Sequence, residues 1–176
     1  QVLWFRTSVR RFLSLIGNLW LATVMFRFIH AADLHLDSAF SGLRRQSGVP
    51  TERITHAARQ ALQAMVGEAI ARRVDFVLIA GDIYDRDWKD WNTGLFFVSQ
   101  MQRLDQADIP VVLIHGNHDA ANKMTRSLRL PPNVEVLPTN AATTASHPRL
   151  AQLGVAVHGQ SFADGAVERN LALEYP

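Results

Sequence analysis

Three short polar clusters in this sequence combine residue types that bind divalent metal ions. They are Asp33-Leu34-His35, Gly81-Asp82-Ile83-Tyr84-Asp85-Arg86 and Gly116-Asn117-His118-Asp119, and each directly follows an apolar run. Carboxylate, imidazole and amide side chains are ligands for magnesium, manganese, iron and zinc. We therefore predict that the three clusters converge on a metal centre in which Asp82 lies between two ions.

The spacing of these residues suits a pair of metal ions that hydrolyses a phosphate ester. Two divalent ions about 3.5–4 Å apart lower the pKa of a bound water and neutralise charge on the phosphoryl group. Asp33 and His35 are two residues apart, so both side chains can face the same way in an extended loop. Asp82 is a candidate bridge, and Asn117 could bind the second ion through its amide oxygen. His118 is then available to protonate the leaving group or to stabilise the transition state.

Other polar residues in or near the clusters are expected to support the metal centre rather than to bind metal. We predict that Asp85 and Arg86 orient the central loop through a hydrogen bond or an ion pair. Asp119 is predicted to position His118. Asp37 lies close to the first cluster, where it could support the centre or form a turn.

The elements around the clusters predict a layered α/β domain. Apolar strands are expected at residues 27–32, 75–80 and 110–115, with amphipathic helices at 51–73 and 92–104 between them. This alternation favours a parallel sheet with both faces covered. Ligands of such sheets gather at the carboxyl ends of the strands, which is where all three clusters lie.

The pattern is less regular after the third cluster. Short strands are expected at residues 134–137 and 154–158, an exposed loop at 139–148, and a helix at 166–173. We find no internal repeat in this part of the sequence.

The composition is that of one ordinary globular domain. The chain has 176 residues, of which 48% are hydrophobic and 19% are charged. It contains no cysteine, which excludes disulfides and thiolate metal sites. The formal net charge is +2, and three arginines within residues 1–24 contribute +3 of it, which leaves −1 for the remainder. Net charge therefore gives no argument for a nucleic-acid partner.

Residues 1–24 differ in character from the residues that follow. Arg6, Arg10 and Arg11 precede an apolar stretch at 12–24, a pattern typical of signal peptides, but the stretch is too short and too interrupted to predict a membrane span. We expect an extension outside the fold, a catalytic domain over residues 25–176, a cytoplasmic location and no membrane partner. A signal or anchor segment is the alternative.

The three clusters resemble the motifs of a known family. DLH, GDIYDR and GNHD, in this order and after these strands, are similar to those of the calcineurin-like metallophosphoesterases. The stretch FRFIHAADLHLDSAFSGL resembles the opening of the SbcD-like DNA-repair exonucleases, especially their YhaO-type branch. The resemblance extends from Met25 to the end of the chain and is sharpest over residues 27–119.

The resemblance implies an α/β fold, a four-layer αββα sandwich of mixed sheets. It also implies a hydrolase that uses two divalent metal ions, manganese in this branch, to cut DNA, often with an SbcC-like ATPase partner. By the same match Asp33 and His35 would bind the first metal, Asp82 would bridge, and Asn117 would bind the second. His118 would be the catalytic histidine.

One feature of the family is missing from this sequence. Family members complete the metal site with later histidines, typically in a Gly-His-x-His motif, which does not occur here. The only histidines after the third cluster are His147 and His158, which are expected in a polar loop and in a strand. We therefore expect a domain truncated after the first half of its metal site.

Two other functions are compatible with these residues. The same metal centre could act on small phosphoesters or phosphoproteins, which the near-neutral charge of the domain favours. Alternatively, the chain could be a catalytically incomplete fragment that acts only in binding. The sequence predicts neither the oligomeric state nor the polarity of cutting.

Overall fold

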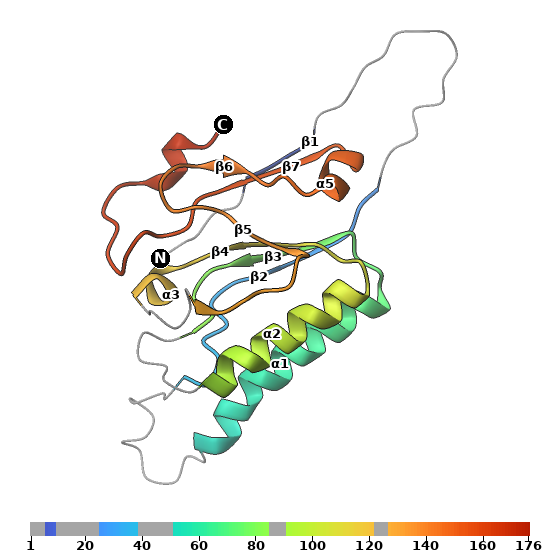
Figure 1. Cartoon of the computed structure of the whole chain (residues 1–176), viewed down its shortest axis with the longest axis vertical. Coiled ribbons are helices and arrows are strands. Elements are labelled where there is room, and N and C mark those ends of the chain that lie inside the picture. Colours follow the sequence, from blue (N-terminus) through green and yellow to red (C-terminus); the bar gives the residue numbers. More distant parts are fainter. Residues whose placement is uncertain (1–5, 10–24, 39–50, 85–90, 122–126) are drawn as a thin grey trace, which may run out of the picture.

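The described part of the chain consists of two β-sheets and the helices that cover them (Figure 1). A computed structural model describes residues 6–9, 25–38, 51–84, 91–121 and 127–176. The elements in chain order are β1 (Arg6–Val9), β2 (Phe28–Ala31), α1 (Thr51–Ala71), β3 (Phe76–Ala80), α2 (Trp91–Gln106), β4 (Val111–Ile114), α3 (Asn117–Ala121), β5 (Val134–Val136), β6 (Thr143–Thr144), α5 (Pro148–Gln152), β7 (Val155–Gly159) and the 3-10 helix η1 (Leu171–Glu174).

One sheet is parallel and carries the three predicted clusters. Its strand order is β2-β3-β4-β5, and each neighbouring pair is parallel. Helix α1 connects β2 to β3, and α2 connects β3 to β4. The second sheet has the order β1-β7-β6 and is antiparallel. The predicted α/β fold with strands of both orientations is therefore confirmed, and the two orientations occupy separate sheets.

The alternation of residues along β3 shows how the layers pack. All five residues of β3 are buried. Val77 and Ile79 join a core cluster with residues of α1 and α2. Phe76, Leu78 and Ala80 join a second cluster that includes residues of β7. Because successive side chains of a strand point to opposite faces, β3 is covered by helices on one face and by the second sheet on the other, as Figure 1 shows.

Helix α1 presents an apolar stripe to the sheet. Leu62, Val66 and Ala69 recur at spacings of four and three residues, and each is at most 1% exposed. The helix ends where Arg73 adopts a left-handed conformation with φ of 49°. The N–H of Val74 then donates to the carbonyl of Ala69, and the chain turns directly into β3.

Three regions differ in detail from the expectations. Residues 6–9, part of the segment expected outside the fold, form β1 and pair with β7, whereas the rest of residues 1–24 is not described. The loop expected at 139–148 contains the short strand β6. The helix expected at 166–173 is wrong, since only the 3-10 helix η1 forms at Leu171–Glu174; Asn170 caps it by accepting from the N–H of Ala172.

The length and apolar character of the helices show whether any of them could span a membrane. Among the described residues, no helix combines the length and the apolar character that a membrane span requires.

Candidate metal centre

The three predicted clusters lie side by side because they follow neighbouring strands. Residues 33–38 follow β2, residues 81–84 follow β3, and residues 115–119 follow β4. The ladder between β2 and β3 continues into the loops. The N–H groups of Asp33, His35 and Leu36 donate to the carbonyls of Gly81, Asp82 and Ile83 at 3.2, 3.0 and 2.8 Å. The first two loops are therefore fixed to each other by their main chains.

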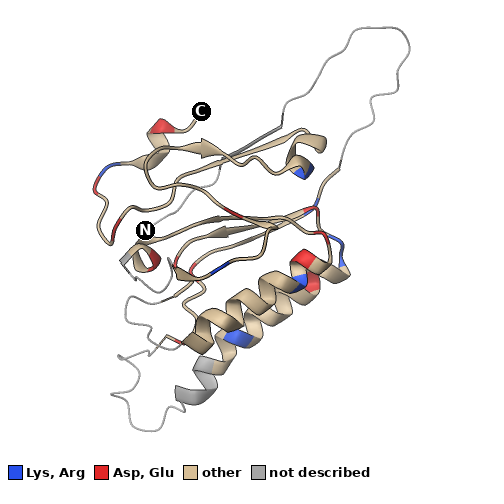
Figure 2. Ribbon diagram, in the orientation of Figure 1, with Lys and Arg blue, Asp and Glu red and all other residues tan. Residues whose placement is uncertain are grey.

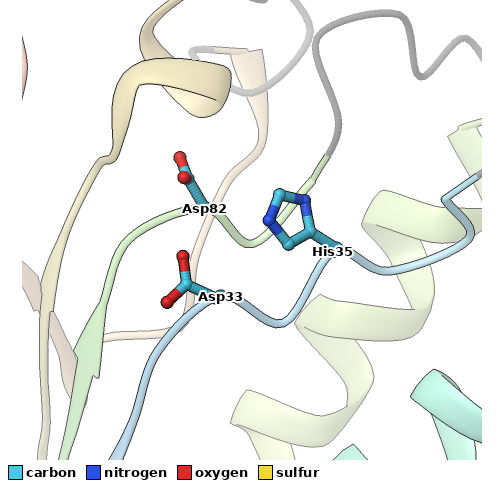
Figure 3. Close-up of side chains that lie close together, drawn as sticks. All are labelled: Asp33, His35 and Asp82. Atoms are coloured by element: carbon cyan, nitrogen blue, oxygen red, sulfur yellow. The ribbon is translucent and has the colours of Figure 1, made fainter. Parts of the chain in front are cut away.

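Asp33, His35 and Asp82 form a compact group of potential ligands. One ligand atom from each lies within 4.8 Å of the others, and Figure 3 shows the two residues of the first loop beside Asp82 of the second. Asp82 is buried, His35 is half-buried and Asp33 is exposed. Two carboxylates and one imidazole form a donor set that fits a divalent metal ion. The structure thus brings together three of the four predicted ligands.

The main chain of all three residues is in an uncommon conformation. The φ angles of Asp33, His35 and Asp82 are 53°, 41° and 49°, in the left-handed region. For residues other than glycine, this region costs on the order of 1–3 kcal/mol each and persists only where the surroundings enforce it. Such strain collects at functional sites, which supports a functional role for the cluster.

Gly116 allows the third loop to approach Asp82 closely. A β-carbon at position 116 would lie 2.1 Å from Oδ1 of Asp82 and 2.6 Å from its main-chain nitrogen. Real β-carbons do not approach other atoms so closely, and the obstructing atoms include main chain. A side chain at position 116 would therefore displace Asp82, so the glycine of this motif is a steric requirement.

His118 lies beside the cluster. Helix α3 begins at Asn117, and the N–H of His118 donates to Oδ1 of Asp82 at 3.1 Å. The imidazole rings of His118 and His35 meet edge to face, with centroids 5.2 Å apart. Asn117 is half-buried between Gly116 and His118. The ligand role of Asn117 and the catalytic role of His118 stay predictions.

Asp119 joins the second and third loops through hydrogen bonds to their main chains. It is 0% exposed, and its carboxylate accepts the N–H groups of Ile83, Tyr84 and Gly116 at 3.0, 3.1 and 3.0 Å. Burial raises the pKa of Asp119 to about 6, the nearby Asp82 adds to this rise, and the three N–H donors oppose it. Asp119 therefore positions the loop of Asp82, a role that the sequence did not indicate.

Asp37 connects the first loop to both helices. Its carboxylate is bound by the guanidinium of Arg59 on α1 and accepts the hydroxyl of Thr93 on α2 at 2.6 Å. Burial acts to raise the pKa of Asp37, but these hydrogen bonds and the charge of Arg59 outweigh it, and the pKa lies below its ordinary value. Asp37 also lies in a turn, in which the N–H of Ser38 donates to the carbonyl of His35 at 3.1 Å. Both roles weighed for Asp37, support beside the cluster and a turn, therefore fit the structure.

The remaining predicted residues lie elsewhere. Asp85 and Arg86 are outside the described residues. His158 is buried in β7, where its Nδ1 is 2.8 Å from the hydroxyl oxygen of Thr144. His147 caps α5 by accepting the N–H of Arg149. Among the described residues, neither histidine joins the cluster of Asp33, His35 and Asp82.

Sequence reasoning missed Arg59 and Thr93. They lie 22 and 56 residues after Asp37 on amphipathic helices, where Arg and Thr are ordinary. No local pattern marks them, because their role depends on how the helices pack against the first loop. Gly116, in contrast, lies within a recognisable motif.

Comparisons with known proteins agree with this geometry. Residues 26–171 match the calcineurin-like phosphoesterase family. The uncharacterized metallophosphoesterase YhaO of Bacillus subtilis is 32% identical over 148 residues, which are 84% of this chain and 36% of YhaO. The DNA double-strand break repair protein Mre11 of Aeropyrum pernix is 32% identical over 104 residues, or 59% of this chain and 24% of that protein. Mre11 of Haloferax volcanii is 33% identical over 98 residues, or 54% and 20%.

The extent of the family match decides what these comparisons establish. The chain spans about a third of the length of YhaO and less of the Mre11 proteins. The family match, in contrast, covers most of the chain and includes all three clusters. This chain therefore belongs to the calcineurin-like phosphoesterases, a family of hydrolases that use divalent metals.

Proposed function

We propose that this chain carries a metal centre that hydrolyses phosphodiester bonds, with DNA as the substrate. The observation that carries the proposal is the cluster of Asp33, His35 and Asp82 at the carboxyl ends of neighbouring parallel strands. The choice of DNA rests on the relatives named as Mre11 DNA double-strand break repair proteins. Two manganese ions are the proposed cofactors.

Each residue of the centre has a proposed task. Asp33 and His35 would hold the first metal, Asp82 would hold both ions, and Asn117 would hold the second. Bound metal ions would supply an activated water and would neutralise charge on the phosphoryl group. His118 protonates the leaving oxygen, for which its place beside Asp82 and His35 is suitable. Asp119 keeps the loops of Asp82 and His118 in register through main-chain N–H groups.

The first experiment replaces the bridging carboxylate. Asp82→Asn removes the negative charge but keeps the size of the side chain, and asparagine tolerates a left-handed backbone. We expect the purified protein to degrade linear duplex DNA with manganese, and Asp82→Asn to reduce the rate at least about 100-fold, since the carboxylate that would hold both metal ions is lost.

Asp108→Asn is the matched control for this change. Asp108 also has a left-handed backbone, with φ of 56°, but it is exposed in the turn after α2. The control should retain full activity. Unchanged activity in Asp82→Asn would refute the proposed mechanism.

A small phosphoester is the second candidate substrate. The distribution of charge favours it, because the Lys and Arg residues of the described part are scattered over several elements rather than gathered along one (Figure 2). Competition between linear DNA and bis(p-nitrophenyl) phosphate in one preparation separates the candidates. If DNA is the substrate, it should inhibit hydrolysis of the small ester strongly, whereas the reverse inhibition should be weak.

A binding role without catalysis is the third candidate. It is favoured by the positions of His147 and His158, which lie away from the three clustered ligands. Calorimetric titration with manganese tests it directly. Two tight sites per chain support the two-metal proposal, and one weak site supports the binding role.

A further inference from the structure

We propose that Asp37, Arg59 and Thr93 form a positioning group that sets how tightly the first loop binds metal. The inference rests on the proposed function in one respect, namely that Asp33 and His35 bind metal. None of the three residues is assigned to the metal itself. They act through the shape of the loop that carries its ligands.

The contacts of Asp37 account for both of its carboxylate oxygens. Nε of Arg59 donates to Oδ1 at 2.8 Å and to Oδ2 at 3.0 Å, and Nη2 of Arg59 also donates to Oδ2. The hydroxyl of Thr93 donates to Oδ2 at 2.6 Å. The side chain of Asp37 is 14% exposed, and Thr93 is 1% exposed. Asp37 is therefore held by two side chains from two different helices.

Arg59 is itself fixed between the loop and the second helix. Its guanidinium carbon lies 5.0 Å from the centroid of the Phe96 ring, in a cation–π contact. Arg59 extends from α1, whereas Phe96 and Thr93 belong to α2. A guanidinium that is hydrogen-bonded on its edge and stacked on its face has little freedom, so it presents a fixed anchor to Asp37.

The anchor matters because the described part of the loop has an uncommon backbone that is held by two sets of contacts. At its start, the N–H groups of Asp33, His35 and Leu36 are bound to the loop after β3. At its end, Asp37 is bound to the helices. Asp33, His35 and Asp37 all have positive φ, at 53°, 41° and 57°. Without the second anchor, only the N–H bonds to the loop after β3 would hold these backbone angles, so the side chain of His35 would be placed less firmly beside Asp33 and Asp82.

The expected effect is a loss of metal affinity in a folded protein. Residues that orient metal ligands from outside typically change affinity about 10–100-fold when they are replaced. We expect Arg59→Gln to weaken manganese binding about tenfold, and Thr93→Val, which removes one hydrogen bond without changing shape, to weaken it about threefold. Arg59→Lys should recover part of the affinity, since one charged donor remains.

Arg149→Gln is the matched control. Arg149 also forms an ion pair with an aspartate, Asp75, at 3.1 Å, and it is similarly half-exposed. Asp75 precedes β3, whereas Asp82 follows it, so this pair lies at the opposite end of the strand. The control should lose comparable stability and keep the manganese affinity of the wild type.

The experiment is calorimetric titration of the whole chain with manganese, with thermal unfolding of each variant in parallel. Lower affinity in Arg59→Gln and Thr93→Val, but not in Arg149→Gln, supports the inference. Equal affinity in all folded variants, or an equal loss in the control, overturns it. If the wild type binds no manganese, the proposed function itself fails. Should Arg59→Gln not fold, Thr93→Val gives the deciding measurement.

Discussion

The two loops that supply the clustered ligands are held in place by different chemistry. The loop of Asp82 is fixed by Asp119, a fully buried carboxylate whose three partners are main-chain N–H groups. The loop of Asp33 and His35 is fixed by Asp37, whose partners are the side chains of Arg59, which is partly exposed, and of Thr93, which is buried. Main-chain partners cannot move away without local unfolding, whereas side-chain partners can change rotamer while the helices that carry them stay folded. The loop of Asp82 should therefore be the more rigid of the two. Removing the contacts of Asp119 should reduce stability and metal affinity more than removing those of Asp37.

Gly116→Ala should have the largest effect on metal affinity and activity, because it acts directly on Asp82 in the more rigid loop. The added methyl group would overlap Oδ1 of Asp82 and displace the central ligand. A displacement on the order of 1 Å costs about 100-fold in activity at a catalytic site, and we expect a similar loss of manganese affinity. The measurements are calorimetric titration and DNA hydrolysis.

Gly67→Ala provides the control for the same chemical change. Position 67 lies in α1 with nothing within 4 Å of an added β-carbon. Alanine is a better helix former than glycine, so this variant should gain about 0.5–1 kcal/mol of stability and keep its metal affinity. A Gly116→Ala protein that binds manganese normally would contradict the steric argument.

Asp119→Asn should rank second. The amide keeps one oxygen but places N–H donors against buried main-chain N–H groups, and each unsatisfied donor costs about 1–3 kcal/mol. We expect a loss of about 3 kcal/mol in the free energy of unfolding and at least a tenfold loss of manganese affinity. Urea unfolding and calorimetry measure the two effects.

Glu135→Gln tests whether any carboxylate that accepts main-chain N–H groups behaves in this way. Glu135 accepts the N–H groups of Ser146 and His147, but these contacts are more exposed and lie away from the metal cluster. Glu135→Gln should lower the free energy of unfolding by less than about 1 kcal/mol and leave metal binding unchanged. A cost equal to that of Asp119→Asn would remove the distinction between the two carboxylates.

Arg59→Gln should destabilise the protein less than Asp119→Asn. Partly exposed ion pairs contribute about 0–1 kcal/mol, so we expect a loss of about 1 kcal/mol in the free energy of unfolding. Urea unfolding of the metal-free protein measures it. A loss as large as that of Asp119→Asn would show that the first loop is held as firmly as the central one.

Added salt should change stability least, but it should separate Arg59→Gln clearly from Asp119→Asn. The screening length falls from about 10 Å at 0.1 M salt to about 3 Å at 1 M, and buried groups are screened least. The stability difference between wild type and Arg59→Gln should therefore shrink in 1 M salt, while that between wild type and Asp119→Asn should not. Parallel urea titrations at both salt concentrations test this, and equal salt dependence would contradict it.

Local sequence patterns predicted the parallel sheet and the place where the candidate metal ligands gather. Apolar runs that end in Asp-x-His, Gly-Asp and Gly-Asn-His marked three strands and the loops at their carboxyl ends. These signals succeed because burial on both faces demands an uninterrupted apolar strand and because turns demand polar residues. The predictions for the short elements after the third cluster were less accurate because those elements are short. A two-residue strand such as β6 and the region before η1 contain too few residues for a period to show.

The sequence by itself determined the types of the candidate ligands, their order and the edge of the sheet where they meet. The tertiary structure alone decided which residues hold those ligands still. Asp119 accepts N–H groups from residues 35 and 36 positions away, and Asp37 is bound from 22 and 56 positions away. Such partners are selected by the packing of helices and strands, whose relative placement is not encoded in any local pattern.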